Sequence, residues 1–279
     1  MSSFKNYLEL TKPGITKMVL FTGFLGAYLA SKSDPQWSKL LFATVGVALA
    51  SASASCFNNF FDKKIDKLMP RTQKRVLPQK KVPPQHALIL GFILGILSFG
   101  TLYFQNNLFA AELALAAIFL YAVCYTYLKR KTPLATEIGA VAGALPPLIG
   151  YAGITGTIDL KAFSLFLIMF LWQDPHFWAL SIKFKKDYAK AKIPVLSTVW
   201  PVKKIQVVTF IYLIALMVAS AWPYFLNMGH ELYLWGVGTA GAVYFILFFK
   251  SLKSKSEFNR VLFLYSIFYL CFIFALLLI

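Results

Sequence analysis

The sequence contains few charged residues and few cysteines. Asp, Glu, Lys and Arg make up 14% of the 279 residues, whereas soluble domains carry about 25%, so an ordinary soluble domain is excluded. The three cysteines, Cys56, Cys124 and Cys271, are widely separated and show no metal-ligand spacing. We therefore expect them to be small apolar helix residues, and we expect neither disulfides nor a thiolate metal centre.

Hydrophobic residues are abundant and occur in long continuous runs. They make up 58% of the sequence, and the mean hydropathy is +0.65. Nine runs approach the ~20 residues that a helix needs to cross a bilayer, and they lack the alternation of a transmembrane β-strand. We predict an all-α, polytopic membrane protein: a single transmembrane domain over residues 1–279, a bundle of nine transmembrane helices. The predicted helix cores are Ile15–Ala30, Leu40–Phe60, His86–Phe104, Leu108–Leu128, Leu134–Gly153, Phe163–Ile182, Ile205–Leu226, Leu232–Phe249 and Val261–Ile279.

Basic residues are distributed unevenly between alternate loops. Of the 28 Lys and Arg residues, only Lys32, Lys39 and Lys161 fall in the loops of one side. The positive-inside rule therefore predicts a cytoplasmic amino terminus and an external carboxyl terminus. This topology accounts for the net charge of +17 without a nucleic-acid partner. Anionic headgroups of the lipid bilayer and an anionic substrate are the expected counterparts. The first apolar run is interpreted as a spanning helix, not as a cleavable signal peptide.

Two predicted cytoplasmic loops, residues 61–85 and 183–204, are longer than simple connectors, so we expect functional residues there. At the start of the first loop, Asn58, Asp62 and Asp66 recur every four residues, which stacks them on one helix face. Two carboxylates about 6 Å apart repel by roughly 3 kcal/mol at an effective dielectric of about 20, so a cation is expected beside them. Oxygen ligands suit Mg²⁺, which usually completes its coordination with water and substrate phosphate. Because several basic residues follow, the predicted ligand is a diphosphate.

The same segment has a second interpretation as a solvated helix end. Lys63, Lys64 and Lys67 alternate with the aspartates and would form weak ion pairs with them. Asn58 favours the interpretation as a metal and diphosphate site. It lies one turn deeper in the apolar helix, where a polar side chain facing lipid would be costly, so we expect it to face a wet cavity. In the second loop, Asp187 taken alone is typical of a solvated acid among lysines.

Several motifs resemble one known superfamily. Asn58-x3-Asp62-x3-Asp66, followed by Arg71, Thr72 and Arg75, resembles the first aspartate-rich motif of the intramembrane aromatic prenyltransferases, which include 4-hydroxybenzoate polyprenyltransferase. Segments 125–133, 142–150, 172–180, 187–188 and 193–196 are similar to the heme-modifying branch, the protoheme IX farnesyltransferases or heme O synthases. The resemblance covers most of the chain. It departs at Gly14, where the family commonly has arginine, so that one phosphate-binding candidate is either missing or replaced by Lys12. It also departs at Ala191, where quinone-modifying members often have a second acid.

The resemblance implies transfer of farnesyl from farnesyl diphosphate to a vinyl group of heme B, with addition of water, to give heme O. The cofactor would be Mg²⁺, with Asp62, Asp66, Asn58 and Asp187 as catalytic and metal-binding residues. The implied diphosphate-binding residues are basic: Arg71, Arg75, Lys129, Arg130 and Lys183. The implied substrate pocket contains Tyr125, His176, Trp178 and Tyr188. The resemblance also implies an inner-membrane enzyme whose active site faces the cytoplasm, and a heme-modifying or terminal-oxidase assembly partner.

Several residues in the spans have open roles. His176 is either a ligand of heme iron or a hydrogen-bonded structural histidine. Asp174 is a functional candidate because an acid in mid-helix is costly, but its role is unassigned, as are those of Glu112 and Glu137. Separately, the Pro146-Pro147 pair is predicted to break or bend the fifth span.

Two other functions compete with heme farnesylation. A membrane transporter also uses buried acids and broken helices, but it predicts polar residues spread through both membrane halves. Here acids and bases concentrate in two loops on one side, which suits a soluble diphosphate. Within the enzyme class, the alternative is prenylation of a quinone precursor such as 4-hydroxybenzoate.

Overall fold

The computed structural model describes residues 3–253 and 260–279, and these residues form helices and loops with no strand among them. Nine spans in this part of the chain are long and apolar enough to cross a membrane. They are α2 (Pro13–Ala30), α3 (Trp37–Asp62), α4 (Pro84–Gln105), the stretch Leu108–Leu128, α7 (Ala135–Thr155), α8 (Leu160–Lys183), α11 (Val202–Phe225), α12 (Glu231–Leu252) and α13 (Arg260–Leu277). The all-α prediction is confirmed, and every span ends within three residues of the predicted core.

The remaining helical segments are short. The stretch Leu108–Leu128 consists of α5 (Leu108–Phe119), a π-helical segment η1 (Leu120–Tyr125) and α6 (Thr126–Leu128). Within residues 3–253 and 260–279, three more helices lie outside the spans: α1 (Phe4–Leu10), α9 (Lys185–Lys190) and α10 (Leu196–Val199).

Large apolar side chains cover the outside of the spans. Ile96 on α4, Val218 on α11 and Trp235 on α12 are each at least 70% exposed. Contiguous apolar surface of this kind is unfavourable in water, and the helices satisfy their own backbone hydrogen bonds. The chain is therefore a multi-pass membrane protein with its outer face against lipid.

Prolines inside the spans do not interrupt the helices. The α7 helix runs from Ala135 to Thr155 through Pro146 and Pro147, so of the predicted break or bend of the fifth span, the break is wrong. The α8 helix likewise passes through Pro175. Membrane helices tolerate proline because local geometry and neighbouring groups compensate for the missing hydrogen bond.

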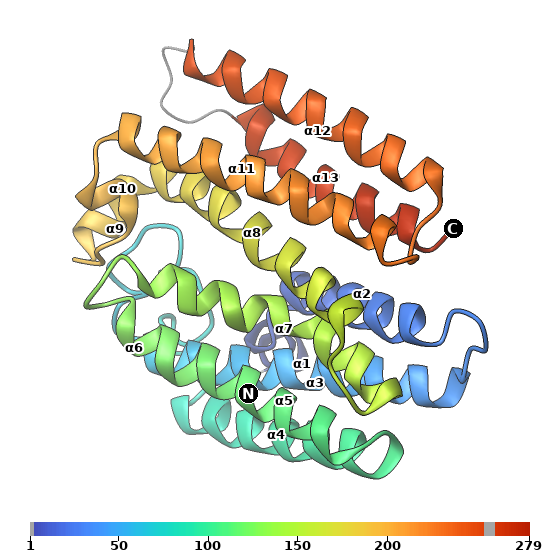
Figure 1. The fold of residues 1–279 in the computed structure, drawn as a ribbon. Coiled ribbons are helices and arrows are strands. Elements are labelled where there is room, and N and C mark those ends of the chain that lie inside the picture. The colour runs from blue at the N-terminus through green and yellow to red at the C-terminus, as the bar shows by residue number, and fades with distance from the viewer. Residues whose placement is uncertain (1–2, 254–259) are drawn as a thin grey trace.

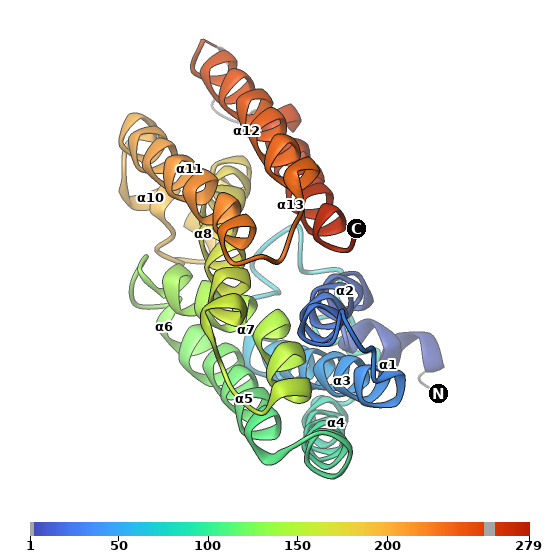
Figure 2. The ribbon, with the colours of Figure 1, turned by 45° about the vertical axis from the view of Figure 1, so that its right-hand side comes forward.

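The spans form two groups that meet at α7 and α8. Figure 1 shows the spans lying side by side, and in the turned view of Figure 2 α2, α3, α4, α5 and α7 gather in one group while α8, α11, α12 and α13 form the other. The α7 helix packs against α2 within its own group and against α8 across the boundary. At the α2 contact the backbones nearly touch, since a Cβ added at Gly150 would lie 2.0 Å from the carbonyl oxygen of Gly23.

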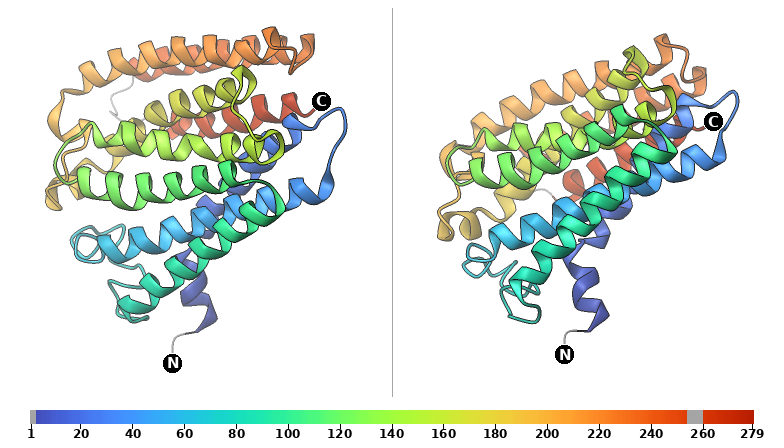
Figure 3. Two further views of the ribbon diagram at one scale, coloured as in Figure 1. Left: turned by 60° about the horizontal axis from the view of Figure 1, so that its bottom comes forward. Right: turned by 90° about the horizontal axis from the view of Figure 1, so that it is seen from below.

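The two long loops lie at the same end of the bundle, which we call the loop end. Figures 1 and 3 show residues 63–83, between α3 and α4, near α9 and α10, which precede α11. The amino-terminal α1 also packs here, because Leu10 shares an apolar cluster with Val76 and Leu77 of the first loop. The structure thus brings together segments more than a hundred residues apart in the chain.

Candidate active site

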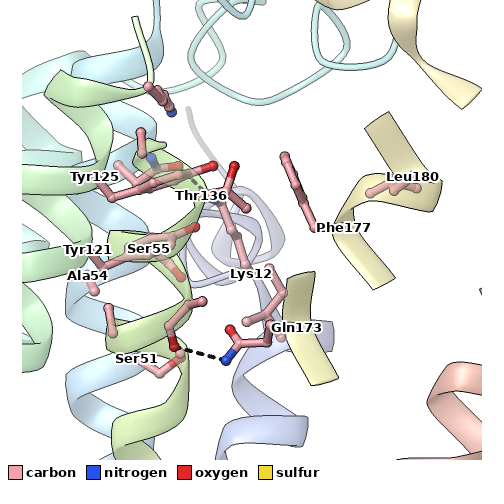
Figure 4. A pocket seen from close by; sticks show the side chains of 18 of the residues that line it. Lys12, Ser51, Ala54, Ser55, Tyr121, Tyr125, Thr136, Gln173, Phe177 and Leu180 are labelled. Atoms are coloured by element: carbon pink, nitrogen blue, oxygen red, sulfur yellow. Dashed lines mark hydrogen bonds between the residues drawn. The ribbon is translucent and has the colours of Figure 1, made fainter. Parts of the chain in front are cut away.

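A cavity of about 570 Å³ lies between the two groups of spans. Figure 4 shows Tyr121 and Tyr125 on one side of it and Gln173, Phe177 and Leu180 on the other. Its interior is lined largely by apolar and small side chains of α2, α3, α7, α8 and α13, including Val19, Val47, Ala50, Ala54, Ile149, Met169 and Leu270. Its loop end is lined by polar side chains from the first loop and from the neighbouring helix ends, namely Lys12, Asn58, Asp62, Asp66, Arg71, Thr72, Arg75 and Lys129. The cavity therefore suits a ligand with a charged head and an apolar body.

The face predicted for Asn58, Asp62 and Asp66 exists and points into this cavity. All three side chains line it, and the residues are at most 4% exposed. The α3 helix ends at Asp62, but the amide of Asp66 donates to the Asp62 carbonyl at 2.8 Å, which extends the helical spacing by one turn. Asn58 Nδ2 donates to Asp62 Oδ2 at 2.9 Å. The interpretation of this segment as a solvated helix end is therefore wrong.

Basic groups surround these oxygen atoms. The contacts are Lys12 Nζ to Asn58 Oδ1 at 2.6 Å, Lys129 Nζ to Asp62 Oδ2, Arg130 Nη2 to Asp62 Oδ1 at 3.5 Å, and Arg75 Nη1 to both Asp66 carboxylate oxygens at 2.8 and 3.0 Å. Four basic side chains, those of Lys12, Arg71, Arg75 and Lys129, line this end of the cavity against two acidic ones. The excess of positive charge favours an anionic ligand.

Burial changes the proton affinity of two of the lysines. Burial and, to a lesser extent, the charge of Arg75 lower the pKa of Lys12 from 10.5 to about 8, while Asp62 and Asp66 oppose the shift. Burial also lowers the pKa of Lys129, although its contact with Asp62 acts in the other direction. Both lysines are therefore held in a poorly hydrated site whose charge is incompletely balanced, a situation that a bound polyanion would relieve.

The two long loops meet through Arg71 and Tyr188. Arg71 Nη2 donates to the Tyr188 hydroxyl at 3.3 Å, and its guanidinium carbon lies 4.8 Å from the ring centre of Phe184. Burial raises the pKa of Tyr188, which keeps the phenol neutral, while the charge of Arg71 opposes the shift. Met69 of the first loop packs in one apolar cluster with Tyr188 and residues 191, 193 and 195 of the second. The loops thus form a common cover over the charged end of the cavity.

The π-helical segment η1 places aromatic rings beside this cluster. Tyr121 and Tyr125 both line the cavity, and their rings are 5.5 Å apart. The ammonium of Lys129 lies 5.2 Å from the centre of the Tyr125 ring. Immediately after η1, the Thr126 hydroxyl accepts a hydrogen bond from Asn58 Nδ2 at 3.0 Å. A π-helical turn inside an α-helix is commonly found at functional sites, and here it aims three polar groups at one place.

The donor set fits Mg²⁺ in its chemistry. Asn58, Asp62 and Asp66 offer buried amide and carboxylate oxygens next to one another, and hard cations prefer such ligands. Among the residues that the structure describes, no three Asp, Glu, His or Cys side chains are grouped closely enough to hold a metal alone. A metal at this position would therefore take further ligands from water and from a substrate phosphate.

The structure brings most of the predicted site residues together at the cavity, but four of them are not part of its lining; one of these four, Arg130, still reaches Asp62. The cavity is lined by Asn58, Asp62, Asp66, Arg71, Arg75, Tyr125, Lys129, His176 and Tyr188, but not by Arg130, Trp178, Lys183 or Asp187. Trp178 is a correction to the predicted pocket: it is 2% exposed and packs behind the cavity wall, with its ring 4.9 Å from that of Tyr212. Asp187 lies on α9 beside Tyr188, and it forms no metal-binding group with Asp62 and Asp66.

His176 is hydrogen-bonded and stacked. Its Nδ1 lies 2.7 Å from the Ser266 hydroxyl, and its ring stacks between Trp172 and Phe263 at centroid distances of 4.8 and 4.5 Å. These contacts between α8 and α13 are those expected of a hydrogen-bonded structural histidine, which was one of the two roles considered for this residue. They fix the orientation of a ring that also lines the cavity.

Some polar residues of the site carried weak signals in the sequence. Thr126 and Tyr121 were not predicted, although Tyr121 precedes Tyr125 by one helical turn and Thr126 lies just before the basic residues at 129 and 130. Gln173 also lines the wall, with its Nε2 donating to the Ala140 carbonyl at 3.0 Å (Figure 4). Glu112 is exposed on α5, away from the cavity lining.

Sequence comparisons identify close relatives of one activity. The model of the UbiA prenyltransferase family matches residues 19–276. A protoheme IX farnesyltransferase of Aquifex aeolicus is 40% identical over 272 residues, which cover 97% of this chain and 93% of that protein. The protoheme IX farnesyltransferase 1 of Pseudomonas fluorescens is 38% identical over 280 residues, which cover 99% and 93%.

Solved structures share the fold. A structure of digeranylgeranylglyceryl phosphate synthase has a TM-score of 0.81 at 19% identity and covers 100% of this chain and 98% of that one. A UbiA homolog from Archaeoglobus fulgidus, bound to DMAPP and Mg²⁺, has a TM-score of 0.73 at 15% identity, with coverages of 98% and 99%. At these identities the likeness establishes the arrangement of helices.

Proposed function

The chain belongs to the UbiA prenyltransferase family, and from this membership we propose that it transfers the farnesyl group of farnesyl diphosphate to a vinyl group of heme B. Water adds in the same reaction, and the products are heme O and diphosphate. The proposed acceptor follows from the relatives named protoheme IX farnesyltransferase, which are about 40% identical over nearly the whole chain.

The observation that carries the proposal is the division of the cavity into a charged end and an apolar interior. Four basic side chains collect at the loop end, and the remaining wall is built from side chains such as Val19, Ile149 and Leu270. A prenyl diphosphate has the same division, with several negative charges at one end and hydrocarbon at the other. The head would lie against Arg71, Arg75, Lys12 and Lys129, and the chain would extend into the interior.

These basic groups would promote departure of the diphosphate. When the allylic C–O bond breaks, its electron pair stays on the diphosphate, and nearby cations stabilise the charge that accumulates there. Arg71 and Arg75 are suited to this role because a guanidinium binds two phosphate oxygens at once. The Arg75 contacts to Asp66 and the Lys12 contact to Asn58 show that these groups already reach one another across the charged end.

Asn58, Asp62 and Asp66 are the residues that would hold Mg²⁺, and the ion when bound would supply further positive charge to the diphosphate oxygens. Of the predicted metal ligands, Asp187 is the least supported, because it stands outside the cavity lining on α9. We propose that it acts from the second loop, next to Tyr188, and not as a ligand of this ion.

Aromatic faces and the absence of water would protect the farnesyl cation. Tyr121, Tyr125 and Phe177 line the cavity close to the charged end, where an aromatic ring attracts positive charge through its face. The apolar interior excludes water, which would otherwise capture the cation as farnesol.

The loop end is proposed to face the cytoplasm of an inner-membrane protein. All but three of the 28 Lys and Arg residues belong to that side by the predicted topology. Farnesyl diphosphate and free diphosphate are water-soluble at their charged ends, so they would enter and leave the cavity there.

The test is an acceptor experiment with purified protein in lipid vesicles. Protein, Mg²⁺, farnesyl diphosphate and heme B are expected to yield heme O by mass spectrometry, together with one diphosphate per adduct. A farnesyl adduct of 4-hydroxybenzoate in the absence of any heme adduct would assign the quinone-precursor function instead. Passage of substrate across the vesicle without any covalent product would assign a transporter.

A further inference from the structure

One acid on the cavity wall has no part in diphosphate binding. Asp174 lies on α8 and lines the cavity, yet it is 0% exposed. Neither of its carboxylate oxygens has a hydrogen-bond donor among the residues that the structure describes. A buried carboxylate without a donor is rare, and such a group is commonly explained by a functional role or by a bound water.

The neighbour of Asp174 is a second carboxyl group. Glu137, in the first turn of α7, lies within hydrogen-bonding reach of Asp174. Two carboxylates repel and cannot bond to each other, whereas a carboxylic acid donates to a carboxylate, so the pair is stable when it holds one proton. Tyr212 of α11 donates to Glu137 Oε2 at 3.2 Å, which completes a cluster from three helices.

A second buried group next to this pair also has no partner. Trp178 lies one helical turn beyond Asp174 on α8, and its indole Nε1 has no acceptor among the described residues. The two side chains share a helix face, so the unpaired indole N–H of Trp178 lies near the unpaired carboxylate of Asp174. A water molecule bound between them would satisfy both. The space between Asp174 at the cavity wall and Trp178 behind it thus suits a polar hydrogen-bonding species in an apolar environment.

The cluster connects the cavity to the protein exterior. Asp174 lines the cavity, whereas Glu137 is partly exposed at the loop end of α7, where the span begins. The other acids that line the cavity, Asp62 and Asp66, are paired with Lys129 and Arg75. Each of those two carboxylates is therefore already engaged by a cation. Among the described residues that line the cavity, Asp174 is the carboxylate with no cationic partner.

We propose that Asp174 accepts the proton released when water adds to the heme-derived cation, and that Glu137 passes this proton toward the loop end. The inference rests on the proposed function. In that reaction the vinyl π electrons form a C–C bond to the farnesyl carbon that has lost diphosphate, which leaves a cation on the other vinyl carbon. Water then forms a C–O bond to that carbon and gives one proton to the Asp174 carboxylate, while the shared proton of the pair moves to Glu137.

The first test compares how the farnesyl group is used. Asp174→Asn keeps the size of the side chain but removes the proton acceptor, and Glu112→Gln removes an exposed acid of α5 as a matched control. In Asp174→Asn we expect heme O formation to fall by about 100-fold, the usual scale for loss of a general base. Diphosphate release should fall less, because ionisation depends on the other end of the cavity. The excess should appear as farnesol or as a heme adduct lighter by one water, and a purely structural role would not change this ratio.

The possible outcomes separate the two proposals. Heme O from the wild type together with an unchanged ratio of heme O to diphosphate in Asp174→Asn would overturn the proton role alone. A wild type that makes no heme adduct would overturn the proposed function and the proton role with it.

A second measurement applies even where Asp174→Asn does not fold. Infrared spectra of the wild type and of Glu112→Gln should contain the carbonyl band of a buried protonated carboxylic acid, and this band should shift or vanish in Glu137→Gln. A wild type without such a band, or a band unchanged in Glu137→Gln, would show that the pair does not share a proton and would refute the relay.

Discussion

Asp62 has a structural task as well as a chemical one, and this determines how its replacement should behave. Asp62 Oδ2 is the ion-pair partner of Lys129, whose side chain is only 14% exposed. Replacement of Asp62 by alanine or asparagine leaves that ammonium buried, near Lys12 and without its acidic partner. Loss of activity in such a variant therefore mixes loss of a metal ligand with loss of stability.

The stability cost can be bounded from the lysine. Breaking a buried charge pair by removing one partner typically costs about 3–5 kcal/mol, and leaving a buried hydrogen-bonding group unsatisfied costs about 1–3 kcal/mol. The unpaired ammonium can also release its proton, which from an ordinary pKa of about 10.4 costs at most about 4.6 kcal/mol at pH 7. For Asp62→Asn we expect a loss of about 2–4 kcal/mol at pH 7, or about 5–10 °C in Tm.

The pH dependence gives the sign of the effect. Between the lowered pKa of the buried amine and about 10.4, the unfolded chain binds a proton that the folded chain does not, so the stability of Asp62→Asn rises with pH in this range. At pH 9 the upper bound on the penalty falls to about 2 kcal/mol. The double variant Asp62→Asn, Lys129→Met removes both charges and should recover most of the stability at pH 7, while remaining inactive in Mg²⁺-dependent diphosphate release.

The assay is thermal unfolding of the purified proteins in detergent at pH 7 and pH 9, with diphosphate release measured on the same samples. A single variant as stable as the wild type, or a penalty that is equal at both pH values, would refute the reasoning. So would a double variant that is no more stable than the single one.

Three further predictions concern other parts of the molecule. Because the pKa of Lys12 is about 8, its positive charge is present below that pH and lost above it. Metal-free binding of an unreactive prenyl diphosphate analogue should therefore weaken by about tenfold between pH 7 and pH 9.5. The variant Lys12→Met should abolish most of that change. Gly150→Ala places a Cβ 2.0 Å from the Gly23 carbonyl oxygen. It should lower the free energy of unfolding by about 1–3 kcal/mol by forcing α2 and α7 apart, which would be measured as a lower Tm. Gly100→Ala, where no heavy atom lies within 4 Å of the added Cβ, should leave the Tm equal or higher. Asp187→Asn should reduce Mg²⁺-dependent diphosphate release by a smaller factor than Asp62→Asn, and an equal loss in kinetic assays of the two variants would place Asp187 among the metal ligands.

The positions of the spans were predictable because each has to cover the bilayer with apolar side chains. The stretch Leu108–Leu128 is the clearest case, since its predicted and observed ends coincide. Hydropathy could not predict that part of this stretch is π-helical. The π-helical segment η1 directs Tyr121 and Tyr125 into the cavity, and a count of apolar residues is the same for a π-helical as for an α-helical turn.

The acid face was predictable for a similar reason. Asn58, Asp62 and Asp66 are four residues apart, and helical geometry alone puts them on one side. Their partners were not predictable from spacing, because Lys12 and Lys129 flank the ends of other helices. Lys12 lies 46 residues before Asn58, and Lys129 lies 67 residues after Asp62. Trp178 was predicted to line the substrate pocket because it is aromatic, and this was wrong. The packing of α8 against α11 places its side chain behind the cavity wall.

The sequence by itself determined that this chain lies in a membrane as nine helices, and that acids and bases concentrate on one side of it, since both properties depend on local composition and on helical period. Only the tertiary structure decided which cations face which acids, that the two long loops close over one cavity, and that Asp174 and Glu137 stand together. These contacts join residues from different helices, and their energies depend on distance and burial, which exist only once the helices have packed.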